Sequence, residues 1–225
     1  MLKLAKVQSR PDFVDEVYKT LLDAISDGSL APGTRITQEE IAEQLNVSRS
    51  PVLQALRLLK KDGLVQDAPG RGLLVATLDP NWIGNLYQVR GALDALAAGL
   101  AAEKKADIPA ELIKKGRKAA AGDDVKAMVD ADIAFHRAIY EASGNPLIVE
   151  TAQLHWVHLR RVMGAVLRLS PQRGTLWDEH EKMAKAIRSG NASLARELSE
   201  QHAQAARENL LQHLQSALET GTASA

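Results

Sequence analysis

Three histidines and one aspartate stand on the apolar faces of predicted helices, where ionisable side chains need partners. Asp132 and His136 share one helix and are one turn apart, so their side chains can converge. His180 and His202 lie on the apolar faces of two further helices. Burying a carboxylate and three imidazoles without partners would cost several kcal/mol for each group.

A single divalent cation would satisfy all four of these side chains. Carboxylate oxygen and neutral imidazole nitrogen suit zinc, and they also suit nickel, manganese or iron. One histidine on an apolar face is more often a core residue with an ordinary partner, but three such histidines and an aspartate favour a metal. The sequence therefore predicts a metal site, with zinc as the first choice, formed by Asp132, His136, His180 and His202.

Arg90 is a candidate for a second kind of chemistry. It precedes Asp94 by four residues, so the two side chains can form an ion pair along one helix. Alternatively, its guanidinium can clamp an anionic ligand near the metal, because it can bind a carboxylate through two parallel hydrogen bonds. The sequence leaves both interpretations open.

A further group of candidates, small polar and basic residues, opens a short helix. The stretch Gln38–Lys61 predicts two short amphipathic helices that meet at a tight corner. The second helix starts at Ser48, which can cap it, and has Arg49 and Ser50 in its first turn. Such a helix N-terminus suits the major groove of DNA and also favours phosphate. The alternative is a helical hairpin in a core, with a solvated basic face.

The segments on either side complete a known DNA-binding architecture. A helix is predicted over 12–27, and two short strands follow the helix pair at 64–66 and 73–77. The turn between these strands is rich in glycine and contains Gly70 and Arg71, which are suited to reach a minor groove. Three helices followed by a basic hairpin predict a winged helix-turn-helix.

The rest of the chain reads as helix alone. Proline and glycine punctuation divides it into helices at 81–104, 109–121, 123–142, 146–169, 172–189 and 192–218. Most are long with one apolar stripe, which favours a compact antiparallel bundle. The predicted fold class is therefore mainly α, with a winged helix-turn-helix domain at 1–78 and an all-helical antiparallel bundle at 79–225.

Composition excludes several other classes of protein. With 225 residues and 45% hydrophobic content, the chain can form one or two well-buried domains. It has no apolar run near the roughly 20 residues needed to span a bilayer, so we expect no membrane partner. It also lacks cysteine, which excludes disulfides and thiolate metal sites and agrees with a cytoplasmic location.

Both halves together resemble the GntR family of bacterial transcription regulators, specifically the FadR-like subfamily with an all-helical FCD domain. In the first half the resemblance rests on Gly28-x-Leu30-x-Pro32-Gly33, Ile41-Ala42-x-x-Leu45-x-Val47-Ser48-Arg49-x-Pro51-Val52, Ala55-Leu56, Leu59 and Gly63-Leu64-Val65. In the second half it rests on Arg90, Asp132-x-x-x-His136, Gly144-Asn145-Pro146, His180 and His202.

The resemblance implies roles for particular residues. The residues expected to contact DNA are Arg35, Ser48, Arg49, Ser50, Gly70 and Arg71. It also implies metal ligation by the three histidines and the aspartate, small carboxylates as effectors, and a dimer that binds a palindromic operator. One departure is Leu53-Gln54, where the family usually has Arg-Glu. Because that arginine commonly reads a guanine edge, Leu53 removes an expected base contact.

The predicted function is therefore a homodimeric, DNA-binding transcription regulator. Its helical domain is expected to bind a metal and a small organic acid, with Arg90 as the effector-binding residue. Two alternatives remain. The first is an enzyme that uses the metal and Arg90 to act on a small carboxylate. The second is a metal sensor without an organic effector.

Overall fold

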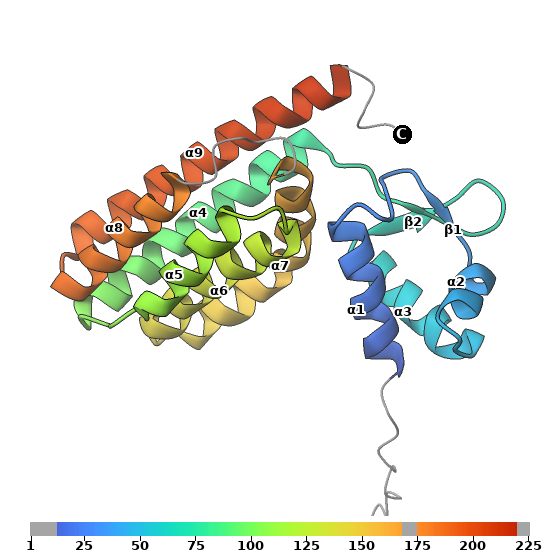
Figure 1. Cartoon of the computed structure of the whole chain (residues 1–225), viewed down its shortest axis with the longest axis horizontal. Helices are drawn as coiled ribbons and strands as arrows, with labels where there is room; N and C mark the ends of the chain where they lie inside the picture. The colour runs from blue at the N-terminus through green and yellow to red at the C-terminus, as the bar shows by residue number, and fades with distance from the viewer. Residues whose placement is uncertain (1–12, 168–174, 220–225) are drawn as a thin grey trace, which may run out of the picture.

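The computed structural model describes residues 13–167 and 175–219, which form a helical bundle beside a smaller mixed region (Figure 1). Within those residues the elements are α1 (Phe13–Ser26), β1 (Arg35–Ile36), α2 (Gln38–Gln44), α3 (Arg49–Lys61), β2 (Val65–Asp67), β3 (Leu73–Val75), α4 (Pro80–Glu103), α5 (Ala110–Ala120), α6 (Val125–Ser143), α7 (Pro146–Leu167), α8 (Thr175–Ser189) and α9 (Ala192–Glu219). The fold is mainly α, as the sequence predicted. No helix in the described part of the chain is long and apolar enough to cross a membrane.

Local sequence fixes the α2–α3 pair. The side chain of Thr37 accepts a hydrogen bond from the backbone N–H of Glu40, and the Glu40 carboxylate accepts one from the backbone N–H of Thr37. This capping box satisfies helix donors that would otherwise have no partner. Asn46 then turns the chain in a left-handed conformation at φ 49°. Ser48 holds the N-cap position of α3, but its side chain makes no capping hydrogen bond, so that detail of the prediction was wrong.

A small antiparallel sheet supports the hairpin that follows α3. The strand order is β1-β3-β2, with Arg35 opposite Leu74 and Val65 opposite Val75. The sequence predicted β2 and β3 but missed β1, because two residues are too few to show an alternating pattern. Gly72 has φ 87°, and a Cβ there would lie 2.7 Å from the carbonyl oxygen of Ile36, so glycine is required where the hairpin meets β1.

Helix α4 is the central element of the bundle, packing against α6, α7, α8 and α9. Asp79 caps its first turn and Pro80 begins it, where a missing N–H costs nothing. Gly144 ends α6 in a left-handed conformation at φ 69°. The helices lie close to their predicted bounds; the predicted ends at 169 and 172 fall outside the described residues.

Helix α7 belongs to the bundle and also contacts the N-terminal region. Val157 packs against the N-terminal core, and the guanidinium of Arg161 donates a hydrogen bond to the carbonyl oxygen of Ala76. Gly164 lies against the end of α1, where a Cβ would clash with the Ser26 carbonyl oxygen. The two regions therefore meet through close packing along one helix, in addition to the chain segment that joins them.

Candidate metal centre and nucleic-acid interface

The four predicted metal ligands meet inside the bundle, although they come from three helices. Asp132 and His136 lie on α6, His180 on α8 and His202 on α9, and all four are buried. One ligand atom from each lies within 4.8 Å of all the others. His180 Nε2 is 3.3 Å from His202 Nε2 and 3.5 Å from Asp132 Oδ1.

These distances agree with a shared cation. In a tetrahedral zinc site with bonds of about 2.0–2.1 Å, neighbouring ligand atoms lie roughly 3.3 Å apart. His136 Nε2 and Asp132 Oδ1 are somewhat farther apart, at 3.8 Å. Asp132 Oδ2 and His136 Nε2 are buried without a hydrogen-bond partner among the described residues, which is costly unless something else satisfies them. The donor set therefore fits a divalent metal ion.

Burial keeps the imidazoles of His136 and His180 in the form that binds metals. It lowers the pKa of His136 well below its ordinary value, and the nearby Arg90 guanidinium lowers it further. Burial likewise lowers the pKa of His180, with His202 adding to the shift. The pKa of Asp132 is raised by burial, against the opposing effect of Arg90. Neutral imidazoles offer free lone pairs at neutral pH, as metal ligation requires.

Glu179 is a site residue that sequence reasoning missed. Its Oε2 lies 2.7 Å from Nδ1 of His202, so the carboxylate accepts the ring N–H. The sequence gives little signal for this contact, because Glu179 does not lie on the apolar stripe of α8 to which His180 belongs, although both side chains reach His202 on α9. Neighbouring residues on a helix do not share a face, so periodicity could not pair Glu179 with α9.

Arg90 makes the ion pair that was one of the two interpretations left open by the sequence. It is only 4% exposed, and its Nε lies 3.2 Å from Asp94 Oδ2, which is the ion pair expected along α4. Its Nη2 lies 3.6 Å from Asp132 Oδ2, so the guanidinium also faces the metal ligands. Neither nitrogen makes a well-formed hydrogen bond to another described residue. The expected binding of an anionic ligand by Arg90 stays a prediction.

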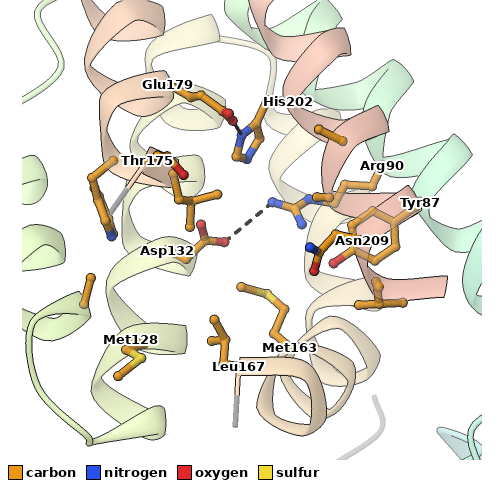
Figure 2. A pocket seen from close by; sticks show the side chains of 16 residues that line it. Tyr87, Arg90, Met128, Asp132, Met163, Leu167, Thr175, Glu179, His202 and Asn209 are labelled. Carbon is orange, nitrogen blue, oxygen red and sulfur yellow. Dashed lines mark hydrogen bonds and ion pairs between the residues drawn. The ribbon is translucent and has the colours of Figure 1, made fainter. Parts of the chain in front are cut away.

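A cavity of about 240 Å³ opens beside this cluster. In Figure 2, Asp132 and Arg90 point toward each other from opposite sides of it, with His202 above them, while Met128, Met163 and Leu167 lie below. The remaining residues that line it are Tyr87, Ala120, Thr175, Leu176, Trp177, Glu179, Ala205, Ala206, Asn209 and Leu210. The cavity thus combines the buried guanidinium of Arg90, two candidate metal ligands and a largely apolar wall, as small-molecule sites commonly do.

The candidate DNA contacts lie on the surface of the N-terminal region. Ser48, Arg49 and Ser50 are exposed at the start of α3, and Gly70 and Arg71 are exposed in the hairpin between β2 and β3. Among the residues that the structure describes, the Arg49 guanidinium has one ion pair, at the surface, with its Nη1 3.4 Å from Glu39 Oε1. Exposed pairs of this kind contribute little stability, so Arg49 can leave Glu39 for another partner at small cost.

Arg35 has a structural contact that the sequence did not predict. Its guanidinium donates hydrogen bonds to the backbone carbonyls of Arg71 and Pro69, at 2.9 and 2.7 Å. These bonds tie β1 to the tip of the hairpin and fix its shape. The expected contact of Arg35 with DNA stays a prediction.

Two family models match the chain. The model described as bacterial regulatory proteins, gntR family, matches residues 13–75, and the FCD domain model matches residues 85–219. An HTH-type transcriptional regulator of Streptomyces ambofaciens is 30% identical over 186 residues, covering 80% of this chain and 78% of that protein. The HTH-type transcriptional regulator LutR of Bacillus subtilis is 31% identical over 196 residues, covering 76% of this chain and 89% of LutR. McbR/YncC of Escherichia coli shares the fold, with a TM-score of 0.77 at 21% identity, over 91% of this chain and 100% of that structure.

Removing histidines from the cluster should remove the metal. We expect His180→Ala and His202→Ala each to lower metal content, because each leaves three ligands, and the double variant to carry none. In the wild-type protein, free metal at 100 times its Kd should stabilise the fold by about 2.7 kcal/mol, and the double variant should lose this gain. Elemental analysis and thermal unfolding with and without a chelator measure both effects.

The matched control is His213→Ala. His213 lies on α9 outside the cluster, and its Nδ1 is 2.7 Å from the Asn209 carbonyl oxygen. This variant should keep full metal content. Full metal content in the double variant would exclude the cluster as the site.

Proposed function

The chain belongs to the gntR family of bacterial regulatory proteins, with an FCD domain, and is a DNA-binding transcription regulator; from this premise we propose that a small organic acid and a divalent metal ion bind together in the helical domain and change the affinity of the protein for an operator. The observation that carries the proposal is the convergence of four buried metal-binding side chains beside a cavity that also contains Arg90. The protein would work in the cytoplasm, where it meets the bacterial DNA.

Contact with DNA is assigned to α3 and to the hairpin between β2 and β3. With α3 in the major groove, Ser48, Arg49 and Ser50 at its N-terminus face the bases and phosphates. Arg71 at the tip of the hairpin then reaches the backbone or the minor groove. Leu53 is exposed on α3 and is suited to an apolar contact with a thymine methyl group, in place of an arginine–guanine contact.

Dimerisation is assigned to an apolar surface on α4 and α7. Trp82, Val89 and Leu96 are exposed and follow one another every seven residues along α4, so they share one face. Leu154 on α7 is 73% exposed, and on the same helix the ring of His158 contacts Trp82 at 4.5 Å, which joins the two helices' surfaces. A two-fold axis near Val89 would pair α4 with its copy in antiparallel fashion, and the two recognition helices would then read two half-sites.

The acid is placed between Arg90 and the metal ligands. One carboxylate would accept hydrogen bonds from Arg90, whose Nε and Nη2 form ion pairs with Asp94 and Asp132 but no well-formed hydrogen bond among the described residues. When bound, the metal supplies positive charge and open coordination positions for further oxygens of the acid. The side chains of Asp132 and His202 line the cavity, so a ligand that reaches Arg90 also reaches this side of the cluster.

Helix α7 contacts both this site and the DNA-binding domain, so the coupling between them is assigned to it. The Arg90 guanidinium lies over the Trp156 ring, 5.5 Å from its centroid. The next residue, Val157, packs against the core of the DNA-binding domain, and Arg161 holds the backbone of Ala76. A ligand that moves Arg90 would therefore shift α7 and, with it, the orientation of α3.

Substituting the exposed arginines should weaken operator binding. Arg49→Ala is expected to cost about 1–3 kcal/mol of binding free energy through loss of a groove contact, and Arg71→Ala should also weaken binding. The control is Arg137→Ala, which removes a surface arginine that pairs with Glu141 on α6. Fluorescence anisotropy on an operator fragment measures all three. Wild-type affinity in both Arg49→Ala and Arg71→Ala would contradict the assigned interface.

A charge on the apolar α4–α7 surface should split the dimer. We expect Val89→Glu and Leu154→Glu to convert a dimer of the full chain to monomers, because each would bury an unpaired charge at the interface. Leu194→Glu, an exposed leucine on α9 outside that surface, is the control and should remain dimeric. Sedimentation equilibrium gives the masses. A wild-type monomer at micromolar concentration, or unchanged dimers in both variants, would contradict the assignment.

Arg90 should be required for the acid but not for the metal. We expect Arg90→Lys to keep the metal and to weaken acid binding, because lysine retains the charge without the two-pronged geometry. Calorimetry with a panel of small mono- and dicarboxylates gives the affinities. In the wild type, the best acid should change operator affinity by about 5–150-fold, the usual range of such coupling.

The same experiment separates the alternatives. Wild-type coupling in Arg90→Lys would contradict the assigned role of Arg90. Consumption of the acid, followed by NMR, would instead indicate an enzyme. A change in operator affinity with metal alone, and none with any acid, would indicate a metal sensor.

A further inference from the structure

Glu179 makes a contact that ligand chemistry alone does not require. It lies on α8 immediately before His180, yet its carboxylate faces His202 on α9, with Oε2 2.7 Å from Nδ1 (Figure 2). The imidazole is buried, whereas the Glu179 side chain is partly exposed at the wall of the cavity. The carboxylate thus approaches the ring from the side opposite the metal-binding nitrogen.

We propose that Glu179 is a positioning residue for the metal site and acts through His202. By accepting the Nδ1–H, it fixes the tautomer in which Nε2 of His202 carries a lone pair. That nitrogen faces the other ligands, 3.3 Å from Nε2 of His180. A carboxylate behind a ligating histidine also makes the imidazole a stronger donor. The inference rests on the metal site proposed above.

The other two histidines lack an equally close partner, which makes this contact distinctive. Nδ1 of His136 is 3.7 Å from Asp94 Oδ2, beyond hydrogen-bonding distance. Nδ1 of His180 has no hydrogen-bond partner among the described residues, and the ring is held by stacking on Phe135 at 4.3 Å. Only for His202, within the described cluster, does a carboxylate accept a hydrogen bond from the ring nitrogen that faces away from the other ligands.

The charges around the cluster also support a role for Glu179 in holding the metal. Three carboxylates, those of Asp94, Asp132 and Glu179, lie within contact distance of the candidate ligands or belong to them. The guanidinium of Arg90 contacts two of them. When ionised, three carboxylates against one guanidinium leave two negative charges, which a divalent cation balances. Removing the charge of Glu179 would therefore weaken the hold on the metal even if the imidazole kept its orientation.

A purely structural role makes a different prediction. If the hydrogen bond only fastened α8 to α9, its loss would destabilise the protein equally with and without metal. The two roles can be separated by measuring metal affinity and metal-free stability in the same variants. Glu179→Gln is informative because its amide oxygen can still accept the N–H but carries no charge.

The experiment compares Glu179→Ala and Glu179→Gln with the wild type in the full chain. Zn²⁺ affinity is measured by chelator competition, and the visible spectrum of the Co²⁺-loaded protein reports the ligand geometry. We expect Glu179→Ala to bind Zn²⁺ about 10–100-fold more weakly and to alter the Co²⁺ spectrum. Glu179→Gln should lie between, with the wild-type spectrum largely kept. Metal-free thermal midpoints should stay near that of the wild type.

Glu181→Gln is the matched control. Glu181 is on the same helix and pairs only with the exposed residues Arg117 and Lys185 among those described, so its loss should leave Zn²⁺ affinity unchanged. Wild-type Zn²⁺ affinity in both Glu179 variants would overturn the inference while leaving the metal site in place. So would an equal loss of stability with and without metal. Absence of Zn²⁺ binding by the wild type would overturn both the inference and the metal site.

Discussion

The burial of one carboxylate and three imidazoles at a single point among α6, α8 and α9 is the constraint on which the bundle depends. Without a shared partner, each group loses its hydration in an apolar core and contributes unfavourably to folding. The proposed divalent cation would reverse this balance, because it would join three helices that otherwise meet through apolar packing and a few polar contacts, such as that of Glu179 with His202. Arg90 extends the same polar cluster to α4, the central helix, through its ion pairs with Asp94 and Asp132. The centre of the bundle therefore contains a cluster of charged and polar side chains, and apolar residues enclose it.

The features expected for DNA binding and those expected for ligand binding lie in separate domains of the chain. The N-terminal domain presents exposed arginines on a rigid α2–α3 pair that is fixed by the Thr37 capping box and the left-handed Asn46. The helical domain presents a cavity that contains the buried guanidinium of Arg90 and part of a cluster of candidate metal ligands. Helix α7 belongs to both environments, since Trp156 lies under Arg90 while Val157 packs on the N-terminal core. Adjacent residues on one helix thus connect the proposed ligand site with the domain that carries the proposed DNA contacts.

Sequence reasoning succeeded where the signal is local or periodic. Proline and glycine punctuation predicted the helix boundaries closely, and polar residues on apolar stripes predicted which four side chains meet. It missed β1 because two residues carry no period, and it wrongly gave Ser48 a capping hydrogen bond. The contact of Glu179 with His202, the bonds of Arg35 to the hairpin and the approach of Gly164 to Ser26 all join segments far apart in the chain. Such contacts depend on how elements pack, and a single sequence does not encode them in any pattern that can be read along the chain.

The central claim is that a ligand at the metal site and DNA at the winged helix influence each other's binding, and reciprocal linkage tests it most directly. The affinity of the best acid is measured by calorimetry on the metal-loaded protein, first free and then saturated with operator DNA. The account predicts that DNA changes acid affinity by the same factor by which the acid changes DNA affinity, because binding free energies around a closed cycle must agree. It also predicts that both factors fall to one after the metal is removed. An acid that binds free and DNA-bound protein equally well would contradict the account.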